Sequence, residues 1–223
     1  MDLPNRTDYE RQLPAALTGQ GQQHAAELAS ALKRDPLADP GQAYWERVES
    51  DRNATPAAIL ILLFMSSATA HGASQDQASQ LAAGMVPERA AAVAEVSTRT
   101  LRDRLAAKQT EWRSQAATLE PSIPILTPAE IDELCDQLVN SQVNSMAITE
   151  VSNGITDASE IVINDLGLKS AFDTWQTERD AKVCPICSPL GGANRDTWNQ
   201  QFPSGPPAHP NCRCYIRYVN LDE

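Results

Sequence analysis

The chain has 223 residues and a formal net charge of −11, from 29 acidic and 18 basic side chains. Aromatic residues make up only 5% of it while alanine is abundant, which favours helices over a β-sandwich or a barrel. The charge excludes a general phosphate-binding surface, above all in residues 120–223, where 15 acidic residues stand against 6 basic ones. Direct DNA binding is therefore not expected from charge, and a basic partner or a solvated acidic face fits better.

Neither a targeting segment nor a membrane span is expected. The N-terminus has no apolar core behind a basic start, which a signal peptide requires. The most apolar run, residues 57–65, is far shorter than the roughly 20 residues of a membrane span. In a reducing cytoplasm, five cysteines argue for metal ligands or free thiols before disulfides.

Residues 1–40 are predicted to form short helices separated by turns, because apolar side chains recur at helical spacing in two separate stretches. Pro36 and Pro40 mark a loop. A helix is then predicted from about Gln42 to a break near Asn53.

A new helix is predicted to begin at Thr55 and Pro56, which suit the N-cap and the first helical position. The segment that follows it, residues 58–65, is apolar all round. It is either a helix buried among its neighbours or a surface that docks on another subunit. In the second interpretation the docking residues are Leu60, Leu63 and Phe64.

The longest helix is predicted to run from Val86 to about Ala117. Its buried face would carry Ala90, Val93, Leu101, Leu105 and Trp112. It is also the most basic stretch of the chain, through Arg99, Arg102, Arg104, Lys108 and Arg113. Those charges indicate a solvated helix face, with a contact to acidic protein or DNA as the alternative. We interpret residues 1–120 as an extended helical region that serves as an arm or docking element.

A linker with two prolines, residues 120–127, marks the predicted boundary to a second domain, residues 127–223. Thr127 and Glu130 have the spacing of a capping box at the start of the next helix. Another helix is predicted from about Met146 to Leu166, ending at Gly167.

The character of the sequence changes after this helix. Residues 171–177 and 214–219 are short, aromatic and β-branched, and are predicted to be two strands. The stretch between them is rich in turns and poor in apolar residues. The predicted fold class is therefore mainly α with a small β and loop C-terminal module (α+β), whose two-stranded end at residues 171–219 is stapled by a metal.

Two cysteine motifs in this module carry the chemistry. Cys184 and Cys187 form a CxxC knuckle, a spacing at which two thiolates grip one tetrahedral metal. The second half of the predicted metal site is His209-Pro210-Asn211-Cys212-Arg213-Cys214. The separation of the two halves is comparable to that in structural zinc sites, so we predict one structural zinc. A thioredoxin-like redox pair, free thiols and later disulfides are the alternatives.

Five donors are available where four suffice. Cys184, Cys187 and Cys212 are the first choice, and His209 and Cys214 compete for the fourth position. Cys135 lies on the apolar stripe of its helix and is predicted to be a buried core thiol. A site closed by four protein ligands has no open position for a substrate water, which indicates a staple and not a catalyst.

An enzyme is not expected. A hydrolytic or nuclease-like site would have to be assembled from acidic residues and one histidine of the C-terminal half: Glu150, Asp173, Glu178, Asp180 and His209. The chain contains none of the nucleophile-elbow, P-loop, HExxH or dinucleotide-binding motifs. A metal-dependent nuclease or other hydrolase remains the alternative, and an acidic scaffold or DNA mimic is a third possibility.

The order of motifs in residues 127–219 resembles the C-terminal domain of the Mu F-like family of phage head-morphogenesis (minor head) proteins. The residues that carry the resemblance are Thr149-Glu150, Trp175-Gln176-Thr177, Asp180, Val183 to Cys187, Leu190-Gly191 and the closing run Pro206-Pro207-Ala208-His209-Pro210-Asn211-Cys212-Arg213-Cys214. The closing run is the most specific of them, and the resemblance covers a little under half of the chain.

The resemblance implies a minor capsid protein of a tailed bacteriophage. Such a protein assembles in the bacterial cytoplasm and lies in the virion, inside the head or at the portal vertex. Its expected partners are the portal protein, the major capsid protein or other copies of itself, and its role in head assembly is structural, with a possible part in DNA packaging or ejection. The first 120 residues match no family pattern.

Overall fold

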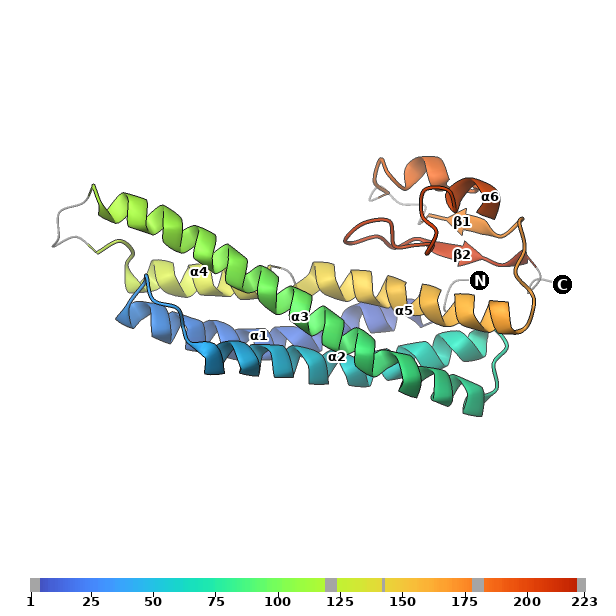
Figure 1. The fold of residues 1–223 in the computed structure, drawn as a ribbon, viewed down its shortest axis with the longest axis horizontal. Helices are drawn as coiled ribbons and strands as arrows, with labels where there is room; N and C mark the ends of the chain where they lie inside the picture. Colours follow the sequence, from blue (N-terminus) through green and yellow to red (C-terminus); the bar gives the residue numbers. More distant parts are fainter. Residues whose placement is uncertain (1–4, 119–123, 142, 178–182, 220–223) are drawn as a thin grey trace. The chain divides into compact units, whose positions relative to one another are not determined.

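The computed structural model describes residues 5–118, 124–141, 143–177 and 183–219. Within them, long helices are followed by a small module with two short strands (Figure 1). This confirms the predicted fold class, mainly α with a small β module. The helices are α1 Arg6–Arg34, α2 Gln42–Ala70, α3 Gln75–Ala116, α4 Pro128–Asn140 and α5 Val143–Asp165. The module contains β1 Thr174–Gln176, the 3-10 helix η1 Ser188–Leu190, α6 Arg195–Trp198 and β2 Tyr215–Arg217.

The first three helices are longer than the sequence predicts. One helix, α1, replaces the predicted short helices and turns, and α2 passes through the predicted break at Asn53 without a restart at Thr55. The third helix begins at Gln75 and not near Val86. Each contains a proline that removes one backbone hydrogen bond, namely Pro14, Pro56 and Pro87. Burial of the apolar side chains on both sides of each proline contributes more free energy than the lost hydrogen bond costs. The local sequence pattern does not show this burial, because it depends on distant segments.

Contacts group the chain into two compact units that are each discontinuous in sequence. Unit 1 contains the described parts of residues 1–13, 58–87 and 144–223, and unit 2 those of residues 14–57 and 88–143. In all three N-terminal helices the change of unit falls at or next to the proline. The predicted division into residues 1–120 and 127–223 follows the sequence and not these contacts, and it stays a prediction.

Unit 2 is built around one apolar core with contributions from α1 to α4. Its buried members include Leu28, Leu32, Trp45, Val48, Leu101, Leu105, Trp112, Ile131, Cys135 and Leu138. The prediction that Cys135 is a core thiol is confirmed, because this side chain is fully buried and burial raises the pKa of its thiol to about 12. The capping box of Thr127 and Glu130 at the start of α4 is confirmed as well.

The basic side chains of α3 in unit 2 are engaged within the protein. Arg102 lies 3.7 Å from Asp39 and stacks over the ring of Trp45, while Lys108 lies 3.0 Å from Glu111. These pairs are largely exposed, so each contributes little to stability. They fit the interpretation of a solvated face.

The apolar segment of α2 belongs to the core of unit 1. Leu60, Leu63 and Phe64 are completely buried, which corrects the interpretation of these residues as a docking surface. Leu63 and Phe64 face α5, where a Cβ at Gly154 would lie 2.7 Å from Cδ2 of Leu63. The two helices approach this closely because Gly154 has no side chain.

Among the described residues, α2 is the one helix with the length and apolar composition of a membrane span. Core helices pass the same test, and 33% of the apolar window of α2 is buried within the protein.

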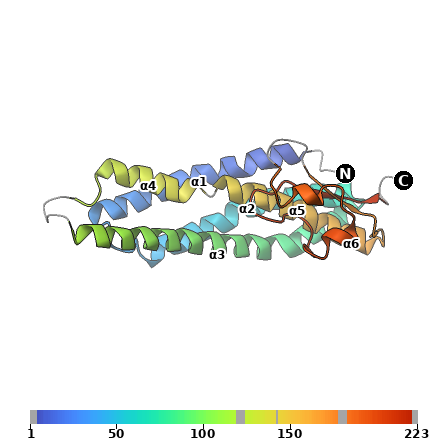
Figure 2. The ribbon, with the colours of Figure 1, turned by 90° about the horizontal axis from the view of Figure 1, so that it is seen from above.

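The C-terminal module contains the two predicted strands, in shorter form. β1 and β2 pair antiparallel, with Trp175 opposite Ile216. Figures 1 and 2 show this module lying along α5, which ends at Asp165 and is followed by Gly167 at φ +67, as its predicted C-cap role requires. The core of the module contains Ile163, Trp175, Leu190, Trp198, Ile216 and Tyr218.

A pair of neighbouring leucines tests the burial of the α2 segment. Leu63→Ala is expected to lower the free energy of unfolding by about 2–5 kcal/mol, because it leaves a cavity against α5. Leu62→Ala is the matched control, since Leu62 is 57% exposed and its truncation should change stability by less than about 0.5 kcal/mol. Urea unfolding followed by circular dichroism measures both, and equal effects would contradict the assigned packing.

Candidate metal centre

The first half of the centre is a tight turn at the CxxC motif. The backbone N–H of Cys187 donates to Sγ of Cys184 at 3.3 Å, and the N–H of Ser188 donates to the carbonyl of Cys184 at 2.9 Å. The turn continues into η1, whose Leu190 packs in the module core. Backbone N–H groups directed at sulfur favour a thiolate, so this turn is suited to presenting two metal ligands.

The second half lies in the loop that leads into β2. The N–H of Cys212 donates to the carbonyl of His209 at 3.1 Å, and Asn211 between them adopts a left-handed conformation with φ +64. Asparagine is among the few residues that tolerate this conformation. The reversal turns His209, Cys212 and Cys214 toward the CxxC turn.

All five predicted donors converge in the folded module. Nε2 of His209 lies 2.8 Å from Sγ of Cys184 and 3.2 Å from Sγ of Cys187. Sγ of Cys187 lies 3.6 Å from Sγ of Cys212. Cys214 completes the cluster with its sulfur within 4.8 Å of those of Cys187 and Cys212.

The separations that join His209 to Cys184 and Cys187, and Cys187 to Cys212, are close to those of donors around one tetrahedral ion. With metal–sulfur bonds of about 2.3 Å and metal–nitrogen bonds of about 2.0 Å, tetrahedral donors stand about 3.8 Å (S–S) and about 3.5 Å (S–N) apart. The sulfur–sulfur separation agrees, and the sulfur–nitrogen separations are shorter by less than about 1 Å, which small side-chain rotations correct. A cavity of about 20 Å³ lies at the cluster, lined by Val183, Cys184, Cys187, His209, Asn211, Arg213 and Cys214.

The histidine is oriented as a ligand. Nδ1 of His209 lies 2.7 Å from the carbonyl oxygen of Pro210, to which it donates. In a neutral imidazole this bond puts the proton on Nδ1, so that the lone pair of Nε2 points at the sulfurs of Cys184 and Cys187. A backbone carbonyl that fixes the tautomer in this way is typical of metal-binding histidines.

The surroundings lower the pKa of two of the four thiols and raise the pKa of the other two. A hydrogen bond from Cys214, aided by backbone N–H groups of Cys214 and Ala208, lowers the pKa of Cys212 to about 5. Burial would raise the pKa of Cys184, but the N–H of Cys187 holds it below the ordinary value. Burial raises the pKa of Cys187 to about 12, and the bond to Cys212 together with burial raises that of Cys214. A cation among them would favour the thiolate of every ligand.

The loop before β2, which carries His209 and Cys212, is attached to α5 by hydroxyl side chains. The sequence analysis did not predict this role for them. Oγ1 of Thr149 accepts the N–H of Asn211 at 3.0 Å, and Oγ of Ser152 donates to the carbonyl of Cys212. Arg6 of α1 in turn donates to Oγ of Ser152 at 2.8 Å. Periodicity could have indicated this face, because Thr149, Ser152, Thr156 and Ser159 recur at helical spacing.

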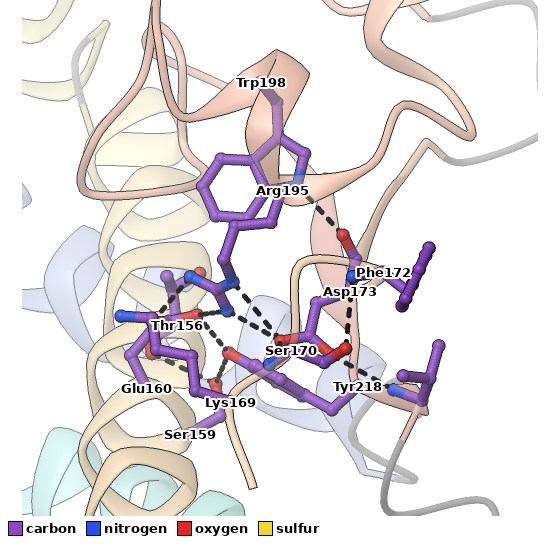
Figure 3. A network of polar contacts seen from close by, with 11 residues as sticks. Thr156, Ser159, Glu160, Lys169, Ser170, Phe172, Asp173, Arg195, Trp198 and Tyr218 are labelled. Atoms are coloured by element: carbon purple, nitrogen blue, oxygen red, sulfur yellow. Dashed lines mark hydrogen bonds and ion pairs between the residues drawn. The ribbon is translucent and has the colours of Figure 1, made fainter.

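A buried ion network attaches the other end of the module to α5 (Figure 3). The guanidinium of Arg195 binds both carboxylate oxygens of Glu160, at 2.7 and 3.1 Å, and also reaches Oδ2 of Asp173 at 3.1 Å. The hydroxyl of Tyr218 donates to Glu160 at 2.9 Å, and Lys169 lies 3.2 Å from the same carboxylate. Burial would raise the pKa of Glu160, but the bonds from Arg195 hold it below the ordinary value.

Asp173 is the fully buried member of this network. It accepts the N–H of Ser170 at 2.9 Å and that of Val219 at 3.2 Å, so it joins the segment before β1 to the segment after β2. These internal hydrogen bonds satisfy the buried carboxylate and assign Asp173 a part in the fold of the module.

The other described residues of the enzyme alternative lie on α5 and in the cysteine cluster. Glu150 is buried on α5 and accepts a hydrogen bond from Asn153, and His209 belongs to the cluster. Glu178 and Asp180 lie outside the described residues. The arrangement in the described residues is therefore a Cys/His cluster that could hold a metal ion.

No protein-family model, curated protein or solved structure matches this chain. The residues of the cluster and their geometry therefore carry the functional argument.

Two variants of the ion network test its contribution. Arg195→Met is expected to lower the free energy of unfolding by about 3–5 kcal/mol, because it leaves the buried Asp173 carboxylate without its cation. Lys169→Met removes an exposed cation from the same Glu160 and should cost about 0–1 kcal/mol. Thermal or urea unfolding of both variants measures the difference, and a small effect of Arg195→Met would show that the network contributes no net stability.

Proposed function

We propose that this chain is a non-enzymatic minor head protein of a tailed bacteriophage, whose C-terminal module is ordered by one structural zinc ion. Its role is structural, in head assembly near the portal. The observation that carries the proposal is the convergence of Cys184, Cys187 and His209 with Cys212 and Cys214, in two groups of donors that share Cys187. His209, Cys212 and Cys214 also lie in the closing run, the most specific part of the resemblance to the Mu F-like family.

Zinc is the metal that the donors favour. Three thiolates and one imidazole in a tetrahedral arrangement match structural zinc sites. Four protein ligands leave no position for a substrate water, which supports a staple. When bound, the metal supplies a cross-link between the CxxC turn and the loop before β2, two segments that contribute few apolar side chains to the core.

The partners are proposed on chemical grounds. With 29 acidic against 18 basic residues, the chain favours a protein partner with basic surface over the phosphate backbone of DNA. The portal protein, the major capsid protein or further copies of this chain are the proposed partners. Leu60, Leu63 and Phe64 are buried in unit 1 and do not form the contact.

Metal content tests the staple. The purified protein is expected to contain one zinc per chain by elemental analysis, and Cys187→Ser should lose it together with amide protection of residues 183–214, because Cys187 is the donor common to both groups of the cluster. The buried Cys135 in unit 2 provides the matched control, since Cys135→Ser should keep the metal.

Two results would contradict this. Wild-type protein that takes up no zinc from a zinc-containing medium would exclude the staple. Metal-dependent cleavage of nucleic acid, abolished by Cys187→Ser while the module stays protected, would support the nuclease alternative instead.

Particle composition tests the role in the head. Quantitative proteomics of purified procapsids and virions, with the portal protein as the internal standard of copy number, is expected to find the chain in few copies per particle. Its absence from both kinds of particle would overturn the proposed function, whatever the metal content of the isolated protein.

A further inference from the structure

A groove of about 250 Å³ lies in unit 1, where the turn between α2 and α3 meets the C-terminal end of α5 (Figure 1). Both sides contribute to its apolar lining, which consists of Ala73, Leu81, Val162 and Leu166. Leu166 lies beside Gly72 and is 46% exposed, so a large apolar side chain is open to solvent at the groove.

The size of the groove indicates what could fill it. Pockets that enclose a whole small-molecule ligand have about 300–1,000 Å³ and bury most of the ligand. This groove is smaller, and its rim is exposed at Gln77, Gln80, Asp165 and Leu166. Protein interfaces commonly place one apolar anchor side chain in a small pocket of this kind. The groove therefore suits a side chain of a protein segment better than a free small molecule.

The helical segments that form the groove carry acidic side chains and no basic ones. Residues 58–87 of α2 and α3 and residues 144–165 of α5 contain no lysine or arginine. Their acidic residues are Asp76, Glu150, Asp157, Glu160 and Asp165. Asp165, which lines the groove, is exposed and forms no ion pair with any residue that the structure describes.

The position of Asp165 strengthens the negative potential at the rim. It is the last residue of α5, and the C-terminus of a helix carries a partial negative charge, which makes a carboxylate unfavourable there. The other polar side chains of the rim, Gln77 and Gln80, are neutral amides. The groove is therefore complementary to an apolar side chain with a lysine or arginine next to it.

We propose that this groove docks a basic amphipathic segment of a partner protein. A large apolar side chain of the segment packs against Leu81 and Leu166, and a neighbouring lysine or arginine binds Asp165. The inference deepens the proposed function, on which it rests for the basic protein partner, and it assigns the contact to a surface other than the buried docking residues predicted on α2. A second copy of this chain is a less complementary occupant, because it carries the same net charge of −11.

Synthetic peptides added to the full-length protein test the docking. The probe is an amphipathic leucine–lysine helix of about 14 residues, or four turns, and its control has glutamate in place of every lysine. The leucine–lysine peptide is expected to shift the NMR methyl resonances of the apolar lining, Ala73, Leu81, Val162 and Leu166. Its affinity should fall as salt is raised, and the glutamate peptide should not bind, because the rim repels it.

Variants at exposed positions identify the groove without disturbing the fold. Leu166→Ser is expected to weaken binding of the leucine–lysine peptide about tenfold, because it removes apolar contact area. Asp165→Asn should weaken it about two- to fivefold, through the loss of one exposed ion pair. The matched controls are Leu62→Ser, at a leucine of α2 outside the groove, and Asp103→Asn, at an exposed carboxylate of α3 in unit 2. Both should leave the affinity within about twofold.

Two results would overturn the inference. One is a set of shifted methyl resonances outside the groove, or the same loss of affinity in the control variants as in Leu166→Ser and Asp165→Asn. The other is a dimer in sedimentation that Leu166→Ser abolishes, which would make a second copy the occupant. Neither result depends on particle composition, which tests the role in the head separately.

Discussion

The fold of the C-terminal module depends on joining two loop ends that have little apolar surface of their own. The CxxC turn and the loop before β2 are distant from each other in sequence. Each contributes mainly cysteines to the shared core. Closing such a loop costs conformational entropy that a small core does not offset. A metal ion bound by the Cys/His cluster would offset this cost, because donors from both ends meet only when the loop is closed.

Helix α5 is the support on which this closure takes place, and its two faces serve different purposes. One face is apolar and packs against α2, where Gly154 admits Leu63 and Phe64. The other carries hydroxyl groups and Glu160 toward the module: Thr149 and Ser152 hold the metal loop, and Glu160 binds Arg195 at the far end. The donors of the cluster are therefore held at one end of a module whose other end is fixed by an ion network.

Sequence reasoning succeeded where the signal was local. The capping box at Thr127, the two short strands, the core position of Cys135 and the convergence of five donors all follow from spacings within a few residues or from ligand chemistry. It failed where packing overrides local preference. Pro14, Pro56 and Pro87 are breakers by local rules, yet each lies inside a long helix, since the apolar residues on both sides are buried against neighbours distant in sequence.

The sequence by itself determined the helical class and the five members of a Cys/His cluster that could hold a metal ion, because helix propensity and donor spacing are properties of neighbouring residues. Only the tertiary structure decided that Leu60, Leu63 and Phe64 belong to a core and that the His209 imidazole points Nε2 at the thiols. It also showed that Asp173, Arg195 and Glu160 form a buried network. Burial, tautomer and ion pairing depend on which distant segments meet, and a linear pattern does not specify that.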